Sequence, residues 1–378
     1  MKPAAAQLNL FADVDSQQVR TEGIKYIGSK LRLLPYIVDI AKRAKVRSVF
    51  DAFSGSTRVS QAFAQIGCDV ITSDISVWSE VFSTCYLLAS EHGRTAELIK
   101  ELNDLKPVDG WFTENYGGDA FDPLGDGYKK PWQRHNTRKL DAIREAIDIM
   151  ALTSYERATA IASLILALDS VDSTLGHFAS YLKEWSPRSY KPLMLEMPNY
   201  VPTKGEHAVR RGDVFQVIDD IPEVDLAYLD PPYGSSNEKM PPSRVRYAAY
   251  YHIWTTVCLN DKPPLFGKAR RRADSRDTVS ASVFEDFRRC PGGRFRVIEA
   301  LEKLIDRVRA KYVLLSYSSG GRATSRELIE VLQHAGKIEE IHEIEHKRNV
   351  MSGMRWTNEW IKPREGRNLE YLYLLKKH

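Results

Sequence analysis

The sequence predicts an α/β protein built on one doubly wound, mostly parallel sheet of seven strands. Short apolar runs typical of buried strands recur along the chain. They lie at residues 46–53, 69–73, 208–213, 225–230, 311–318, 337–346 and 370–376. Helix-periodic segments alternate with these runs, which is the pattern of parallel strands joined by crossover helices. The last two runs have no helical pattern between them, and we expect them to pair antiparallel.

The predicted helices carry apolar residues three and four positions apart. The first spans residues 24–44 and places Leu31, Leu34 and Ile37 on one face, with Lys and Arg on the other. Gly67 ends the second helix, because glycine favours helix termination. This second helix is expected at residues 58–66. The other helices are expected at residues 137–150, 155–168, 295–308 and 326–334.

The chain divides into a tail, a discontinuous α/β domain and an insertion. Residues 1–22 are small and polar and read as a flexible tail, whereas residues 23–84 and 206–378 carry the strand–helix alternation. Residues 85–205 interrupt this alternation, and a segment of that length must hold structure of its own. We expect it to be mainly helical.

Composition excludes several classes of protein. The 378 residues include 54 Lys and Arg against 50 Asp and Glu, and 43% of them are hydrophobic, which excludes a disordered, collagen-like or disulfide-rich chain. The longest apolar helical run, 160–168, is too short for a membrane span of about twenty residues. With no secretory signal and no C-x-x-C pair, we expect a cytoplasmic protein without a membrane partner.

Acidic residues follow three of the predicted parallel strands. Open α/β sheets bind ligands at the carboxyl ends of their strands. Asp51 and Asp74 end the first two strands, and the turn after Asp51 holds one glycine where G-x-G-x-x-G has three. Asp74 is placed to bind ribose hydroxyls, so the pattern predicts a nucleoside ligand without phosphates. A plain strand-to-helix turn with a surface acid remains the alternative.

The third acidic strand end carries the strongest chemical signal, Asp230-Pro231-Pro232-Tyr233. The two prolines remove two backbone donors, so this segment cannot extend a sheet. The Asp230 carboxylate and the Pro231 carbonyl then become acceptors beside a flat aromatic ring. Two such acceptors can hold both hydrogens of an exocyclic amine on a stacked base. A strand that simply breaks into a turn is the alternative.

Three motifs in this order resemble the α group of adenine-specific DNA amino-methyltransferases, which is similar to the bacterial DNA adenine methylases. They are Lys25-Tyr26-Ile27-Gly28-Ser29-Lys30, Asp51-Ala52-Phe53-Ser54-Gly55-Ser56 and Asp230-Pro231-Pro232-Tyr233. The resemblance implies a Rossmann-like methyltransferase sheet and a target-recognition region at 85–205. It also implies methyl transfer from S-adenosyl-L-methionine, without a metal, to the N6 amine of an adenine flipped out of double-stranded DNA.

The resemblance assigns roles at the cofactor residue by residue. Tyr26 and Lys30 would flank the methionine end of the cofactor, and Asp74 would hold its ribose. Asp213 and the adjacent Val214 would contact the adenine of the cofactor. The residues that would line the cofactor from the first strand and its turn are Asp51, Phe53, Ser54, Gly55 and Ser56.

It assigns the catalytic residues and one DNA-facing segment in the same way. Asp230 and Pro231 would accept hydrogen bonds from the N6 amine, and Tyr233 would stack on the target base. Tyr251 and His252 would begin a helix that faces the DNA. The implied catalytic residues are therefore Asp230, Pro231, Pro232 and Tyr233.

Two basic segments are candidates for further DNA contacts. Residues 262–276 hold six basic residues against one acid, which favours phosphate contacts by Arg270, Arg271 and Arg272. Residues 177–204 mix aromatic with basic residues, and base reading is one interpretation of this mixture. Its candidates are Lys183, Arg188 and Lys191. A solvated loop for the first segment and core aromatics for the second are the alternatives.

One motif is interpreted as a chance match. His342-Glu343-Ile344-Glu345-His346 reads H-E-x-x-H, which binds zinc only on a helix, where positions four apart share a face. The flanking residues Ile338 and Ile341 belong to a short β-like segment. We expect a surface strand here and no metal.

The tail holds Gln7-Leu8-Asn9-Leu10-Phe11, which resembles the peptide that docks bacterial DNA-processing proteins onto the replication sliding clamp. The clamp and a cognate restriction endonuclease are therefore the expected protein partners, beside DNA. Two other functions stay open on the sequence: an N4-cytosine or RNA methyltransferase, and a non-catalytic DNA-binding module that keeps the fold.

Overall fold

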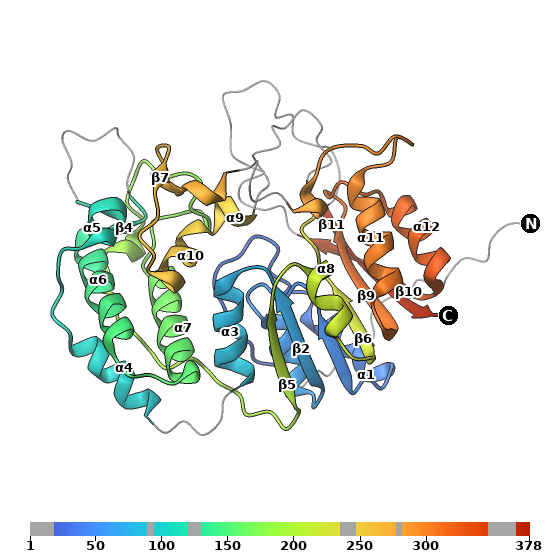
Figure 1. Ribbon diagram of the computed structural model, residues 1–378, viewed down its shortest axis with the longest axis horizontal. Helices are drawn as coiled ribbons and strands as arrows, with labels where there is room; N and C mark the ends of the chain where they lie inside the picture. The colour runs from blue at the N-terminus through green and yellow to red at the C-terminus, as the bar shows by residue number, and fades with distance from the viewer. Residues whose placement is uncertain (1–18, 89–93, 120–129, 235–246, 277–281, 347–367) are drawn as a thin grey trace, which may run out of the picture.

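The computed structural model describes residues 19–88, 94–119, 130–234, 247–276, 282–346 and 368–378. A seven-stranded sheet forms its centre (Figure 1). Its order across the sheet is β10-β11-β9-β6-β1-β2-β5. The strands are β1 (Ser48–Asp51), β2 (Asp69–Asp74), β5 (His207–Arg211), β6 (Val224–Leu229), β9 (Ala310–Ser318), β10 (Gly336–His346) and β11 (Asn368–Lys377).

The pairing confirms the predicted mostly parallel sheet. β1 pairs parallel with both β2 and β6, and β5 and β9 extend the sheet in parallel on either side. β11 pairs antiparallel with both β9 and β10, as the two last apolar runs predict. The chain first builds outward from β1 to β5 and then returns to place β6 on the other side of β1. This reversal creates a switch point where the carboxyl ends of β1 and β6 leave room for a ligand.

Helices cover both faces of the sheet because alternate strand residues point to opposite sides. In β6, Leu226 and Tyr228 pack toward α1 (Leu34–Arg43) and α2 (Arg58–Gln65). Ala227 and Leu229 pack toward the other face. That face is covered by α8 (Val214–Val217), η2 (Ile218–Asp220), α11 (Arg296–Arg307) and α12 (Ser325–Ala335).

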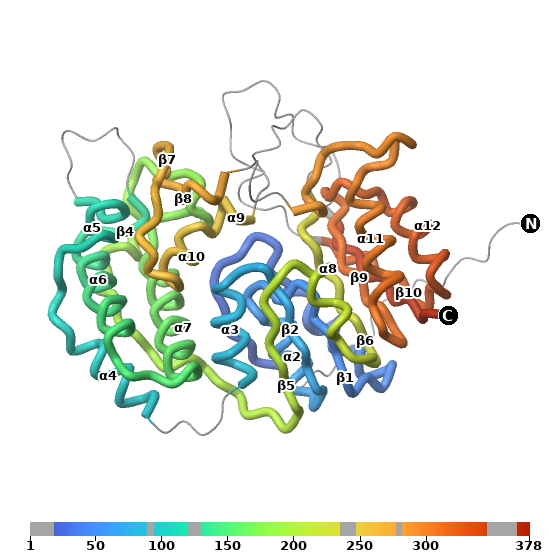
Figure 2. Tube along the Cα trace, viewed as in Figure 1, coloured from blue at the N-terminus to red at the C-terminus, as the bar shows by residue number. Residues whose placement is uncertain are grey.

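A second, helical core stands beside the sheet (Figure 2). α3 (Val77–Leu87) joins the two, since it packs against β2 and β5 as well as against the helical core. Arg144, which is fully buried, donates to the carbonyls of Val257 and Cys258 and thereby ties α6 to α10. The helices of this core are α4 (Thr95–Asp104), α5 (Trp111–Tyr116), α6 (Arg134–Ile149), α7 (Ser154–Ser170) and α10 (His252–Leu259).

Short elements complete the described chain. They are α9 (Tyr247–Tyr250), the ribbons β3 (Gly117–Gly118) with β4 (Trp132–Gln133) and β7 (Leu265–Phe266) with β8 (Arg271–Arg272), and the 3-10 turns η1 (Pro187–Tyr190), η4 (Ala273–Ser275) and η5 (Val283–Glu285). In the described part of the chain, no helix combines the length and the apolar character that a membrane crossing requires.

The first predicted helix is shorter than its periodicity suggests. The helix begins at Leu34, and residues 24–33 form turns instead. Gly28 has φ +98°, which a helix cannot contain. In addition, the backbone amides of Lys25 and Ile27 donate to Asp169 and to the Tyr251 hydroxyl, so tertiary partners replace helical hydrogen bonds.

Two other expectations about segments have a clear outcome. α4 and α5 lie in the insertion that is expected to be mainly helical, but their individual positions are not predicted, because acidic, glycine and aromatic residues obscure the helical spacing of Leu98 and Leu102. The H-E-x-x-H segment lies in β10, which confirms the predicted strand. His342 there pairs with Glu340, 2.8 Å away.

Candidate active site

A cavity of about 560 Å³ opens at the carboxyl ends of β1, β2, β5 and β6. Its volume lies within the range of pockets that hold cofactors and small ligands. The cavity brings together residues from all three sequence motifs, which are far apart along the chain. The predicted site residues in its wall are Tyr26, Lys30, Phe53, Asp74, Asp213, Val214, Asp230, Pro231, Pro232, Tyr251, His252 and Arg272.

Asp74 is held rigidly at the end of β2. Its Oδ2 accepts from the Gly55 amide at 2.9 Å, and its Oδ1 accepts from the Ser76 amide at 2.8 Å. These bonds fix the carboxylate at the rim of the cavity, with a second lone pair on each oxygen left for a ligand. Ile75, the next residue, is 72% exposed and lies in the same wall.

The turn at residues 54–57 shapes the cavity without forming the wall itself. Ser54, Gly55 and Ser56 are expected to line the cofactor, whereas all three are buried and lie outside the cavity wall. The Ser54 hydroxyl bonds to the Ser73 carbonyl and to Ser79, so it joins the turn to β2 and α3. Gly55 has φ +48°, a left-handed conformation that favours glycine, and it lies next to the Tyr26 ring.

Asp51 also lies behind the wall rather than in it. Its side chain is only 1% exposed, and its Oδ2 accepts from the Ser60 hydroxyl. Oδ1 has no hydrogen-bond partner among the residues that the structure describes. Burial, with the nearby Asp230 adding to it, raises the pKa of Asp51 to about 7 against the lowering effect of Ser60.

This buried acid predicts a pH-dependent stability. The pKa of Asp51 rises from 3.8 to about 7 on folding, so the folded protein binds this proton more tightly than the unfolded chain. The contribution of Asp51 to the free energy of unfolding therefore falls as the pH rises from about 4 to about 7, and then stays constant. We expect Asp51→Asn to gain stability relative to the wild type over this window. Urea unfolding of both proteins at pH 5 and pH 8 measures the difference; a pH-independent difference would contradict the prediction.

Aromatic rings form the opposite wall of the cavity. The Tyr26 ring contacts Trp78, Tyr247 and Tyr251 with centroid distances of 5.6, 5.5 and 4.8 Å. The Tyr251 hydroxyl accepts from the Ile27 amide at 2.7 Å, which ties the start of α10 to the first motif. This cluster supplies flat, apolar faces next to the acids of the strand ends.

The acid of the Asp-Pro-Pro-Tyr segment faces the cavity, and its tyrosine does not. Pro231 and Pro232 lie in the wall beside Asp230. The Tyr233 hydroxyl donates to Asp230 Oδ1 at 2.5 Å, and its ring packs on Tyr317 with a centroid distance of 4.8 Å. The structure therefore differs from the expected base-stacking position of Tyr233, because the hydrogen bond to Asp230 turns the ring toward β9.

Asp213 caps the short helix α8 at the far end of the cavity. Its Oδ1 accepts from the Phe215 amide at 2.8 Å, as an N-cap residue does. Phe284 of η5 stacks on Phe215 at 5.9 Å and meets Phe53 edge-on at 5.2 Å. Asp213 and Val214 thus lie in an apolar corner of the cavity wall.

Two of the predicted DNA contacts, Arg272 of the basic segment and His252 of the DNA-facing helix start, have surroundings other than those expected. Arg272 is 5% exposed at its side chain and pairs with Asp261 and Asp274, each at 2.7 Å. His252 is 1% exposed, and burial lowers its pKa to about 3, so it is a neutral ring inside α10. Both are held inside the protein because α10 and the β7–β8 ribbon pack on the helical core.

Arg270 and Arg271 lie on the same ribbon but are placed differently. Arg270 is exposed at the turn, whose carbonyls at Ala269 and Arg270 accept from the hydroxyls of Tyr181 and Tyr116. The Arg271 guanidinium stacks over the Phe266 ring at 4.8 Å. Arg272 anchors the ribbon, so the exposed cations stand on a rigid support.

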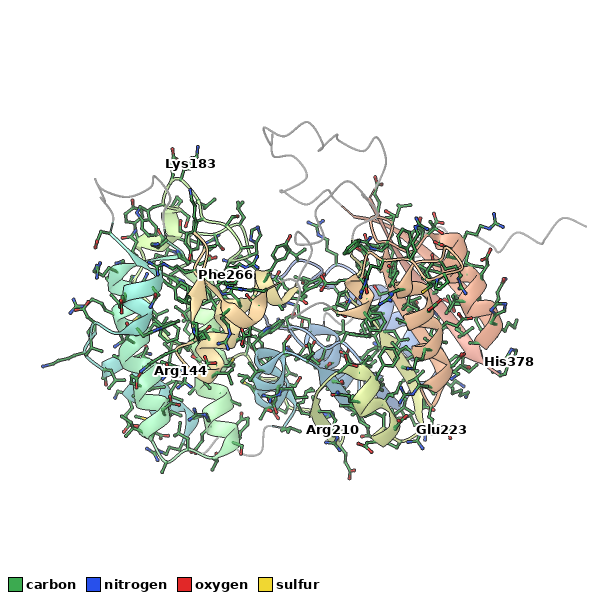
Figure 3. The ribbon with its side chains drawn as sticks, turned by 45° about the horizontal axis from the view of Figure 1, so that its top comes forward. Arg144, Lys183, Arg210, Glu223, Phe266 and His378 are labelled. Atoms are coloured by element: carbon green, nitrogen blue, oxygen red, sulfur yellow. The ribbon has the colours of Figure 1, made fainter. Side chains whose placement is uncertain are left out.

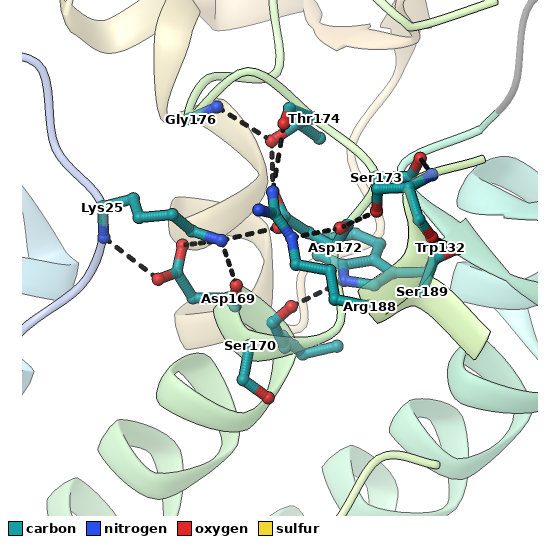
Figure 4. A network of polar contacts seen from close by, with 12 residues as sticks. Lys25, Trp132, Asp169, Ser170, Asp172, Ser173, Thr174, Gly176, Arg188 and Ser189 are labelled. Carbon is teal, nitrogen blue, oxygen red and sulfur yellow. Dashed lines mark hydrogen bonds and ion pairs between the residues drawn. The ribbon is translucent and has the colours of Figure 1, made fainter. Parts of the chain in front are cut away.

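The candidates at residues 177–204 also separate into exposed and engaged residues. Lys183 and Lys191 are exposed. Lys183 lies at the top of the helical half of the molecule in the view of Figure 3. Arg188 instead pairs with Asp172, which is 1% exposed and also binds Lys25 (Figure 4). This network ties the first motif to the helical core, and it engages the guanidinium of Arg188, which is a candidate for base reading.

Several residues of the site belong to no motif that could be recognised in the sequence. Trp78 and Tyr247 reach the cavity from helices that no motif marks. Phe284 and Glu285 reach it from η5, a segment for which the sequence predicts neither a motif nor a helix. These four residues are recognised as part of the cavity wall only from the fold. The aromatic content of the segments around them is a weak indication in the sequence.

Comparison with known proteins shows the family to which the chain belongs. The model of the D12 class N6 adenine-specific DNA methyltransferase family matches residues 26–282. The Type II methyltransferase M.NlaIII of Neisseria lactamica is 26% identical over 94% of this chain and 99% of its own length. The modification methylases StsI of Streptococcus sanguinis and LlaI of Lactococcus lactis subsp. lactis are 25% and 24% identical over 82% of this chain. The chain spans about half of their length, 46% and 48% respectively.

A solved structure of a Thermoplasma acidophilum protein matches 92% of the chain with 9% identity and a TM-score of 0.31, a likeness too distant to add to the fold described above. The family match carries more weight, since it covers more than half of the chain and includes the three motifs of the site except Lys25. Members of this family methylate adenine in DNA, and a methyltransferase of this kind implies the use of S-adenosyl-L-methionine. The chain belongs to the D12 class N6 adenine-specific DNA methyltransferases and is a site-specific DNA adenine methyltransferase.

Proposed function

We propose that one cavity binds the cofactor at Asp74 and the flipped adenine at Asp230, and that methyl transfer takes place between them. The observation that carries this proposal is the presence of both carboxylates in the wall of the same cavity. An adenine inside a duplex cannot reach such a cavity, so the target base must leave the stack, at a cost of a few kcal/mol.

The residues of the cavity fit S-adenosyl-L-methionine. Its cationic, phosphate-free structure suits a wall that carries the carboxylates of Asp74, Asp213 and Asp230 and lacks a glycine-rich phosphate loop. Asp74 would accept from the ribose hydroxyls, and the exposed Ile75 would cover one face of the adenine ring. When bound, this group supplies an electrophilic methyl on a sulfonium. The proposal requires no metal.

The target amine is a poor nucleophile because its lone pair is delocalised into the ring. In our proposal the Asp230 carboxylate and the Pro231 carbonyl accept its two hydrogens. These bonds strengthen as positive charge develops on the nitrogen, so they lower the barrier more than they stabilise the bound substrate. Pro231 and Pro232 have no amide hydrogen, so no backbone donor competes for the acceptors. The aromatic wall of Tyr26, Tyr247 and Tyr251 would hold the base in line with the methyl.

We further propose that the β7–β8 ribbon contacts the DNA backbone and that the helical insertion at 85–205 recognises the target sequence. The exposed Arg270 is the clearest phosphate contact, since hydroxyls of the helical core fix the turn that carries it. Phosphate contacts position a protein on DNA and do not depend on sequence. Lys183 and Lys191 remain candidates for base reading.

Arg270→Ala tests the phosphate contact. Loss of one phosphate contact reduces the slope of log affinity against log salt by about 0.9. We expect this reduction with a weaker affinity for all DNA sequences and an unchanged kcat at saturating DNA. Titration of labelled DNA at several salt concentrations measures the slope. Arg326→Ala removes an exposed arginine of α12, outside the cavity wall, and serves as the matched control. Equal slopes for Arg270→Ala and the wild type would exclude the contact.

Two protein partners complete the proposal. The relatives named as Type II and modification methyltransferases support a cognate restriction endonuclease that acts on the same DNA sequence. The clamp-binding peptide Gln7-Leu8-Asn9-Leu10-Phe11 lies outside the described residues and stays a prediction. Treatment of unmethylated plasmid with the protein and S-adenosyl-L-methionine, followed by modification-sensitive sequencing, tests site specificity. Methylation at one short recurring sequence is expected, and methylation scattered over adenines would contradict recognition by the insertion.

A further inference from the structure

A second carboxylate lies behind Asp230. Glu370 stands at the start of β11, and because this strand pairs antiparallel with β9 at Ser318, its start lies at the carboxyl edge of the sheet. Glu370 Oε2 is 4.0 Å from Lys30 Nζ and 3.4 Å from the Tyr233 hydroxyl oxygen. The Glu370 side chain is 13% exposed and does not belong to the cavity wall. It therefore faces the active site from inside the protein.

Lys30 and Tyr233 connect this glutamate to Asp230. Lys30 Nζ is 3.0 Å from Asp230 Oδ1, and the Tyr233 hydroxyl donates to the same oxygen at 2.5 Å. Lys30 also donates to the Gly28 carbonyl at 3.0 Å, which fixes its ammonium above the Tyr233 ring. Both contacts fall on Oδ1, and so Oδ2 is the oxygen left for the substrate amine.

We propose that Glu370 is a positioning residue for methyl transfer. Through Lys30 and Tyr233 it orients the Asp230 carboxylate, so that Oδ1 is held by the protein and Oδ2 accepts from the target amine. This inference rests on the proposed function, because it takes Asp230 as the group that holds the N6 hydrogen. It adds a residue that lies outside all three sequence motifs.

The charge of Glu370 has its own consequence. Without it, Lys30 would neutralise Asp230 and weaken it as an acceptor at the moment when the amine becomes positive. With two carboxylates around one ammonium, the site keeps a net negative charge. Burial raises the pKa of Asp230, while Lys30 and the Tyr233 hydrogen bond lower it and Glu370 raises it. The other titratable groups that face Asp230 are Tyr26, Asp51, Tyr228 and Tyr247.

Glu370→Gln tests the proposal, because it removes the charge and keeps the shape. We expect kcat to fall about tenfold with KM for DNA and for S-adenosyl-L-methionine within about twofold, as for an interaction that acts in the transition state. Loss of the negative charge lowers the pKa of Asp230, which must be ionised to accept. The acidic limb of the curve of kcat against pH should therefore move to lower pH. Tyr233→Phe removes a hydrogen bond that favours the ionised form and should move this limb to higher pH.

The matched control is Glu343→Gln, the same chemical change at an exposed residue of the neighbouring strand β10. It should leave kcat and the pH profile unchanged. An unchanged kcat and an unmoved acidic limb in Glu370→Gln would overturn the proposal. The proposal would also be overturned if Glu370→Gln lowered the thermal midpoint and raised KM without moving the acidic limb of the pH profile, because that result indicates a purely structural role. Absence of transfer in the wild type would overturn the proposed function itself, and the inference with it.

Discussion

Replacement of Asp230 with alanine is expected to lower kcat by about 10²- to 10³-fold. The carboxylate is the charged acceptor in the cavity wall beside Pro231, and loss of one such preorganised group costs about 10² to 10³ in rate. The effect should appear in kcat, because the interaction grows as the amine becomes positive. Single-turnover methyl transfer at saturating DNA and S-adenosyl-L-methionine measures it.

The fold should survive this change, which makes the result interpretable. Lys30 keeps a carboxylate near it in the variant, since Glu370 lies 4.0 Å away. Cofactor binding, followed by calorimetry, should stay within about threefold of the wild type, because Asp74 holds the ribose at another strand end. Asp230→Asn keeps one acceptor oxygen and should retain more activity than the alanine variant. Wild-type turnover in Asp230→Ala would overturn the mechanism.

Asp74→Ala is expected to weaken S-adenosyl-L-methionine binding by about 10- to 100-fold. Hydrogen bonds to a charged group contribute about 1.5–3 kcal/mol, and each 1.4 kcal/mol is a factor of ten in affinity. The carboxylate also fixes the Gly55 and Ser76 amides, so the turn loosens when it is removed. KM for the cofactor should rise, and kcat at saturating cofactor should recover most of the wild-type value.

Asp220→Ala provides the control for this variant. Asp220 is an exposed acid of η2 that lies outside the cavity wall. Its removal changes the net charge in the same way and should leave the affinity for the cofactor unchanged. Equal affinities in Asp74→Ala and Asp220→Ala would show that the cofactor does not use the end of β2.

Much of the fold could be predicted because the strands of a parallel sheet are buried on both faces. The central strands β1, β6 and β9 are mostly buried and read as such apolar runs, and all seven strands are present near their expected positions. The boundaries of the first helix could not be predicted, since its start depends on tertiary partners. Asp169 and the Tyr251 hydroxyl lie far along the chain from the amides of Lys25 and Ile27 that they bind.

The acids of the site could be predicted for a related reason. Asp74 and Asp230 end parallel strands, and the carboxyl ends of these strands must meet at one edge of the sheet. Glu370 could not be found in this way, because it starts an antiparallel strand and belongs to no motif. The position of the Tyr233 ring was also beyond the sequence, since it depends on the hydrogen bond to Asp230 and on packing against Tyr317.

The surroundings of the basic residues show a limit of charge patterns. A run such as Arg270, Arg271 and Arg272 predicts a polyanion contact, but the three residues do not share one backbone conformation. Arg270 lies in the turn before β8 with φ +49° and is exposed, whereas Arg272 lies in β8 and pairs with Asp261 and Asp274. Charge alone does not show which arginine anchors the ribbon.

Nucleoside mass spectrometry after methyl transfer tests the central claim most directly. Unmethylated double-stranded DNA and, in a parallel reaction, RNA are incubated with the protein and S-adenosyl-L-methionine that carries a deuterated methyl group, and then digested to nucleosides. The account predicts labelled N6-methyladenine as the product, and its loss with Asp230→Ala. Labelled N4-methylcytosine, or label in RNA instead of DNA, would contradict the account.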